Sequence, residues 1–134
     1  MVGLDTNVVV RYLAQDDPKQ SAAANKLFET VLTPDEPGFV SAVVLCEIAW
    51  VLAECYGADR ARIRTALEGL LVARQLSVEA PDTVRKALRA WGESGADFAD
   101  ALIGAVAASH GAAKTVTFDR AAAKLPGFEL LAPL

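Results

Sequence analysis

The chain opens with the stretch Met1-Val2-Gly3-Leu4-Asp5-Thr6-Asn7, in which a short apolar run leads directly into an acid. Its short apolar run predicts a buried first strand, and Asp5 stands where that strand ends. A buried carboxylate is costly unless something cationic meets it. The same pattern recurs late in the chain, where residues 114–118 run into Asp119. Two strands that each end in an aspartate indicate a shared acidic site at one edge of a sheet.

The size and composition of the chain favour one compact domain over residues 1–134. Its 134 residues are 53% hydrophobic, which is typical of a globular protein with a sizeable core. No apolar run approaches the roughly 18 residues of a membrane span, and no secretory signal is visible. We therefore expect a cytoplasmic protein with no membrane partner. The net charge of −4 does not by itself suggest nucleic-acid binding.

The periodicity of the apolar residues predicts strands that alternate with helices. Asp17 before Pro18, and Asp59 further on, have the character of helix caps, while Gly57 is typical of a helix end. We expect helices over 7–14, 18–32, 42–56, 59–71, 81–95, 97–110 and 121–125, and later strands at 39–41, 76–78, 115–118 and 128–131. This alternation predicts an α/β fold with a central, mostly parallel β-sheet flanked by α-helices on both faces.

Glu47 is an acid inside the apolar run Val43–Trp50. It falls about one and a half turns into the helix that leaves the second strand, so it is expected to overhang the same edge as Asp5. A glutamate among apolar neighbours is seldom fully solvated, and burial without a partner would raise its pKa. The alternative is a flank position paired with an arginine.

Asp97 and Asp100 lie three residues apart, on one face of a helix rich in alanine. They can form a capping box, with Asp97 as the N-cap and Asp100 as the third-position acid. Asp5 and Asp119 have a comparable alternative as turn or cap aspartates. We interpret Asp100 as a metal ligand and leave Asp97 as a cap or outer ligand.

Several carboxylates in one place repel one another unless a cation neutralises them. Oxygen ligands suit Mg²⁺, with Mn²⁺ as a substitute, whereas His110 with Cys46 and Cys55 makes no credible zinc set. The two cysteines sit nine positions apart on one predicted helix, which is too far for a disulfide, so we expect both to be buried as small apolar side chains. A lone histidine also excludes a histidine-pair ribonuclease and a Ser-His-Asp triad, and no phosphate-cradling glycine loop is present. The chemistry that follows most directly from clustered carboxylates and a bound Mg²⁺ is metal-assisted phosphodiester hydrolysis.

Taken in order, these motifs resemble the PIN-domain family, and within it the small VapC-type toxins of prokaryotic toxin–antitoxin pairs. The resemblance rests on Leu4–Val8, Glu47, Asp97–Ile103 and Thr117–Asp119, and it covers essentially the whole chain. It implies a Mg²⁺-dependent ribonuclease with Asp5, Glu47, Asp100 and Asp119 as the acidic quartet that binds the metal.

The resemblance also implies supporting residues and partners. Asp97 would be an auxiliary acid, and Thr6, Asn7 and Thr117 would orient the carboxylates or a bound water. The expected substrate is single-stranded or structured RNA. The expected partners are a second copy of the chain, in a homodimer, and a small cognate antitoxin that blocks the active-site groove.

Three other interpretations stay open at this point. A phosphatase with Asp5 as nucleophile would want a second aspartate two residues later, where this chain has Asn7. A catalytically silent PIN-like binding module would keep the fold without turnover. A general RNA-processing nuclease would keep the activity without an antitoxin.

Overall fold

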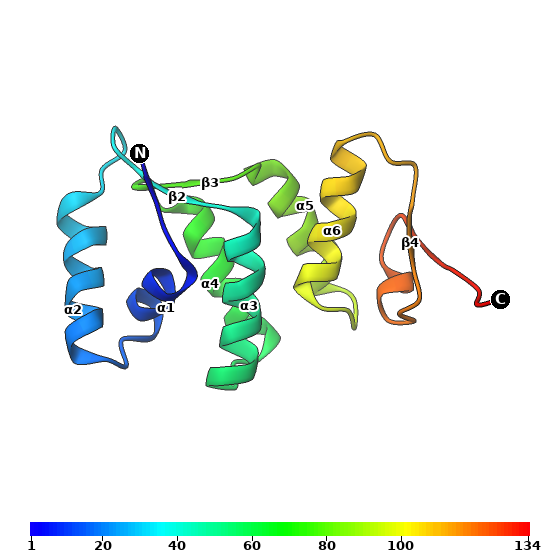
Figure 1. Cartoon of the computed structure of the whole chain (residues 1–134), viewed down its shortest axis with the longest axis horizontal. Coiled ribbons are helices and arrows are strands. Elements are labelled where there is room, and N and C mark those ends of the chain that lie inside the picture. Colours follow the sequence, from blue (N-terminus) through cyan, green and yellow to red (C-terminus); the bar gives the residue numbers. More distant parts are fainter. The chain divides into compact units, whose positions relative to one another are not determined.

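The computed structural model describes all 134 residues, and they form two compact units, residues 1–79 and residues 80–134. Each unit has its own parallel strands and its own packed helices (Figure 1).

The first unit is built on a three-stranded parallel sheet with the order β1-β2-β3. The strands are β1 (Val2–Gly3), β2 (Gly38–Val40) and β3 (Leu76–Val78). In register, Gly3 pairs with Phe39 and Phe39 pairs with Ser77. Because parallel neighbours cannot be joined by a hairpin, helices supply both connections. The Leu4 N–H donates to Phe39 O at 2.9 Å, so the pairing of β1 continues up to Asp5.

Four helices complete the first unit. They are α1 (Thr6–Ala14), α2 (Pro18–Lys26), α3 (Ala42–Tyr56) and α4 (Arg60–Val72), and a π-helical turn, η1 (Leu27–Val31), extends α2. Asp17, Ser41 and Asp59 cap their helices as side-chain acceptors. Gly57 ends α3 with φ +62°, a conformation that glycine adopts without strain.

The helices of the first unit bury one apolar core. α1 packs against α2 and α3, and α4 packs against α3 and β3 (Figure 1). Val40, Leu45, Ile48 and Leu67 are fully buried at the centre. The Tyr12 ring stacks on Phe28 with centroids 4.1 Å apart, which ties α1 to the π-helical turn. This core holds the start of α1 and the middle of α3 in fixed positions.

The second unit packs two helices and a two-stranded parallel sheet. Its elements are α5 (Pro81–Gly92), α6 (Phe98–Ser109), β4 (Thr115–Thr117), the 3-10 turn η2 (Ala122–Lys124) and β5 (Phe128–Leu130). α5 and α6 lie side by side, and Trp91 meets Phe98 edge-on with centroids 5.8 Å apart. His110 is the C-cap of α6, as expected.

The structure confirms the α/β class, the parallel strands and the order of elements. The strand hydrogen bonds form a three-stranded and a two-stranded sheet, where we expected one central sheet. β1 is also exposed rather than buried; only Leu4, just after it, lies in the core. None of the helices combines the length and the apolar character that a membrane crossing requires.

Candidate active site

In the first unit, Asp5 stands at the carboxyl end of β1 and caps α1. Its Oδ1 accepts a hydrogen bond from the Thr6 N–H at 2.8 Å. The expected cap role is thus present, but it uses only one carboxylate oxygen. Oδ2 of Asp5 makes no hydrogen bond to protein and is available to a ligand.

Glu47 lies on α3 and is tied to the same region by Thr6. The Thr6 hydroxyl donates to Glu47 Oε1 at 2.9 Å across 41 positions of sequence, and Thr6 itself is buried. Asn7 is exposed beside them at the start of α1. The structure therefore brings Asp5, Thr6, Asn7 and Glu47 together within one unit.

These four residues line a hollow of about 490 Å³. Its other lining residues are Val10, Arg11, Asp16, Val51, Cys55 and Tyr56. The lining carries three carboxylates and one guanidinium, which suits a ligand that carries both a cation and an anion. A metal ion with a phosphate is such a ligand.

In the second unit, Asp100 is a carboxylate with neighbours of the same charge. It is half-buried in the first turn of α6. Desolvation raises the pKa of Asp100, and the charges of Asp97 and then Asp119 raise it further, while the backbone N–H of Asp97 acts in the opposite direction. The structure thus brings Asp97 and Asp119 close enough to Asp100 for their charges to act on it.

Asp119 follows β4 and caps the 3-10 turn. Its Oδ1 accepts hydrogen bonds from the N–H groups of Ala121 at 2.8 Å and Ala122 at 3.2 Å. The Thr117 hydroxyl in turn accepts from the Asp119 N–H at 3.1 Å, so Thr117 shapes the loop that carries this acid. As with Asp5, the second carboxylate oxygen makes no hydrogen bond to protein.

Asp97 has the backbone geometry of an N-cap but makes no side-chain cap hydrogen bond, and it is exposed. The expected capping box is therefore absent on the Asp97 side. Its carboxylate is instead a charged neighbour of Asp100.

Two expectations about burial were wrong. Glu47 is exposed although its sequence neighbours are apolar. It lies on the same outward face of α3 as Val43 and Trp50, which are exposed as well. The two cysteines are free, as expected, but Cys46 is only half-buried and Cys55 is exposed rather than packed in the core. Burial raises the pKa of the Cys46 thiol, and the Glu47 charge adds to that rise.

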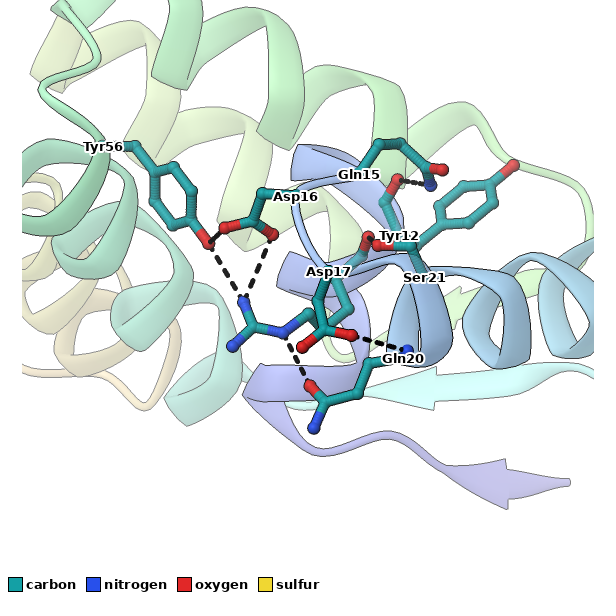
Figure 2. A network of polar contacts seen from close by, with 8 residues as sticks. Tyr12, Gln15, Asp16, Asp17, Gln20, Ser21 and Tyr56 are labelled. Carbon is teal, nitrogen blue, oxygen red and sulfur yellow. Dashed lines mark hydrogen bonds and ion pairs between the residues drawn. The ribbon is translucent and has the colours of Figure 1, made fainter.

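Sequence reasoning missed one polar network that borders the hollow (Figure 2). Arg11 donates from Nε to Gln20 Oε1 at 2.7 Å and from Nη1 to Tyr56 Oη at 3.0 Å. The Tyr56 hydroxyl donates to Asp16 Oδ2 at 2.7 Å, and Asp16 also pairs with Arg11 at 3.4 Å. The Asp16-Asp17-Pro18 run predicted only the end of one helix and the cap of the next, so no local pattern predicted contacts to Tyr56.

The family comparison matches the PIN domain over residues 2–127, which spans nearly all of both units. The chain belongs to the PIN-domain family. It is also similar to a VapC ribonuclease of Aquifex aeolicus (strain VF5), with 28% identity over 130 residues, covering 97% of this chain and 95% of that protein. PIN domains are typically metal-dependent nucleases.

The donor chemistry of this PIN domain fits a hard divalent cation. The candidate ligands are all carboxylates, and the pKa of Asp100 is raised first by burial and then by the charges of Asp97 and Asp119, which a cation would offset. The quartet is divided between the units, with Asp5 and Glu47 in one and Asp100 and Asp119 in the other. No three His, Cys, Asp or Glu side chains of the structure form a group that could hold a metal ion.

Proposed function

We propose that this PIN domain is a Mg²⁺-dependent ribonuclease, and that residues 1–134 act as one domain. The observation that carries the proposal is the pairing of acids in each unit. Thr6 ties Glu47 into the hollow that Asp5 lines, and burial together with the charges of Asp97 and Asp119 raises the pKa of Asp100. The family match runs across both units, which supports a single functional domain.

In this proposal Asp5, Glu47, Asp100 and Asp119 hold the metal, with Mn²⁺ as a substitute for Mg²⁺. When bound, such an ion lowers the pKa of a coordinated water and stabilises charge on a phosphoryl group. Thr6 fixes the rotamer of Glu47 through its hydroxyl. Thr117 fixes the backbone that presents Asp119, and Asn7 and Asp97 are auxiliary polar groups beside the ligands.

The test is cleavage of RNA by purified protein with Mg²⁺, compared with Asp5→Asn and Asp100→Asn. Asp35→Asn is the matched control, because Asp35 is an exposed acid outside both acidic groups. We expect wild type and Asp35→Asn to cleave and both site variants to lose nearly all activity. Equal cleavage by all four proteins would refute the assignment.

We further propose that the protein is the toxin of a type II, VapBC-type pair. The similarity to a VapC ribonuclease over 97% of the chain supports this role. A cytoplasmic homodimer, neutralised by a small cognate antitoxin, is the corresponding assembly. Induced expression should arrest growth with wild type and not with Asp5→Asn, and light scattering should report the mass of a dimer.

The two remaining candidates give different results in the same experiments. A general RNA-processing nuclease would cleave RNA but would not arrest growth, and no small DNA-binding protein would be encoded beside it. A silent binding module would show no cleavage. It would also gain no thermal stability from Mg²⁺ or Mn²⁺, because an ion raises the melting temperature only when it binds the folded protein.

A further inference from the structure

Arg11 is the only basic residue among those that line the hollow beside Asp5 and Glu47. The acids of that lining are Asp5, Asp16 and Glu47. RNA is a polyanion, and its affinity for proteins comes largely from contacts between basic side chains and phosphates. Any strand that enters this hollow therefore meets one group suited to its backbone, the Arg11 guanidinium.

The guanidinium of Arg11 is held by three elements, which leaves one edge free. Nε is bonded to Gln20 on α2, and Nη1 is bonded to Tyr56 at the end of α3 and to Asp16 in the α1–α2 loop (Figure 2). Nη2 makes no hydrogen bond to protein. A planar fork that is fixed in advance loses little side-chain freedom when it binds a phosphate.

The pairing with Asp16 does not use up the charge of Arg11. The 3.4 Å contact is long, and both side chains are partly exposed, at 31% for Arg11 and 44% for Asp16. Surface pairs of this kind contribute little to stability. The pKa of Asp16 is lowered mainly by its hydrogen bond from Tyr56, and the charge of Arg11 is the smallest of the causes.

We propose that Arg11 binds a backbone phosphate of the RNA strand, adjacent to the phosphate that is cut. Asp16, Tyr56 and Gln20 are positioning residues that hold its guanidinium at the hollow. This inference rests on the ribonuclease function proposed above. A contact to a neighbouring phosphate is made equally in the bound substrate and in the transition state, so its loss raises KM and leaves kcat nearly unchanged.

The test compares Arg11→Gln, Arg11→Lys and wild type on a single-stranded RNA oligonucleotide at several salt concentrations. Lys26→Gln is the matched control, because Lys26 is an exposed cation at the far end of α2 and outside the hollow. For Arg11→Gln we expect KM to rise about tenfold, the cost of one charge-assisted hydrogen bond. The slope of log KM against log salt should fall by about 0.7, the value for one phosphate contact on a single strand. Arg11→Lys should keep the slope.

Asp16→Asn separates phosphate binding from a merely structural role. The substitution keeps the shape of the side chain and an acceptor oxygen that can hold Arg11, but it removes the negative charge beside Arg11. If Arg11 binds phosphate, Asp16→Asn lowers KM or leaves it unchanged, which is the opposite sign to Arg11→Gln. If the network only stabilises the fold, both variants raise KM together, and that result would overturn the inference. Circular dichroism and melting temperature confirm that each variant is folded.

The outcomes also distinguish this inference from the ribonuclease proposal. Cleavage by wild type with an unchanged KM and salt slope in Arg11→Gln refutes the inference and leaves the activity standing. If wild type does not cleave, fluorescence anisotropy with the same oligonucleotide measures whether Arg11 contributes to RNA binding. Weaker binding and a smaller salt slope in Arg11→Gln would support the phosphate contact without turnover. Equal binding by both proteins, or no binding by wild type, would overturn it.

Discussion

Replacing Thr6 by valine is expected to change both the stability of the protein and its affinity for metal. Thr6 is buried, and its hydroxyl makes the 2.9 Å hydrogen bond to Glu47 Oε1. Valine keeps the branched shape at the first position of α1 but has no donor. The released Glu47 carboxylate is exposed and takes water instead, so no buried acceptor is left unsatisfied.

The expected loss is that of one ordinary hydrogen bond, about 1 kcal/mol. At about 2.1 cal/mol/K per residue, this lowers the melting temperature by about 4 °C if the whole chain unfolds together, and by about 6 °C if residues 1–79 unfold alone. The second expected effect is on Mg²⁺. Loss of a group that orients a metal ligand typically weakens metal binding at least about tenfold.

Thermal melts over a Mg²⁺ titration measure both effects in one experiment. Thr6→Ser is the matched control, because serine keeps the hydroxyl and should retain most of the metal-dependent gain. The reasoning would be refuted if Thr6→Val lost stability but kept the Mg²⁺ response of wild type, since Glu47 would then not depend on Thr6 as a ligand. It would also be refuted if the serine and valine variants behaved alike.

Three further predictions follow from single contacts. Asp100→Asn should raise the melting temperature of the metal-free protein, because it removes the desolvated charge that Asp97 and Asp119 oppose, and it should abolish the gain from Mg²⁺ in the same melts. The hydrogen bond from Tyr56 lowers the pKa of Asp16 from 3.8 and raises the pKa of Tyr56 from 10.0, so its stabilisation is full between these values. This stabilisation is lost as pH falls through the lowered pKa of Asp16 or rises through the raised pKa of Tyr56. Chemical denaturation should therefore show that the free energy of unfolding of Tyr56→Phe changes less with pH than that of wild type. An unchanged pH profile would contradict this account. Gly104→Ala should cost about 1–3 kcal/mol in urea unfolding, because a Cβ there would lie 2.9 Å from Phe128 Cζ, and Phe128→Leu should restore much of the loss.

The helix boundaries were predictable because their signals are local. Asp17 accepts from the Gln20 N–H and Asp59 accepts from the Arg62 N–H, so each cap lies within three residues of its donor. Gly57 ends α3 because glycine readily adopts the positive φ that this helix end requires. Signals of this kind are present in the sequence whatever the rest of the chain does.

The exposure of Glu47 was not predictable from its neighbours. α3 is apolar on its outer side as well as its inner side, with Val43 at 69% and Trp50 at 63% exposure. A run of hydrophobic residues therefore gave no indication of which face was buried. Only the packing of Leu45 and Ile48 into the core settles the rotation of the helix and leaves Glu47 at the hollow.

The network around Arg11 was beyond sequence reasoning for a different reason. Arg11 and Tyr56 are 45 positions apart, and Asp16 and Tyr56 are 40 apart. Neither pair follows a helical or strand period, so no pattern in one sequence connects them. The fold creates these contacts when α1 packs against α3.

The cap and ligand interpretations of the aspartates are compatible, because a cap needs only one carboxylate oxygen. Asp5 and Asp119 each accept backbone N–H groups through Oδ1 alone, which leaves Oδ2 of each side chain for a cation. At Asp100, burial and two acidic neighbours raise the pKa against the effect of one backbone N–H. A cation bound there would offset this unfavourable charge. Metal affinity should accordingly depend on pH through Asp100, with protons released on binding at pH values below its raised pKa.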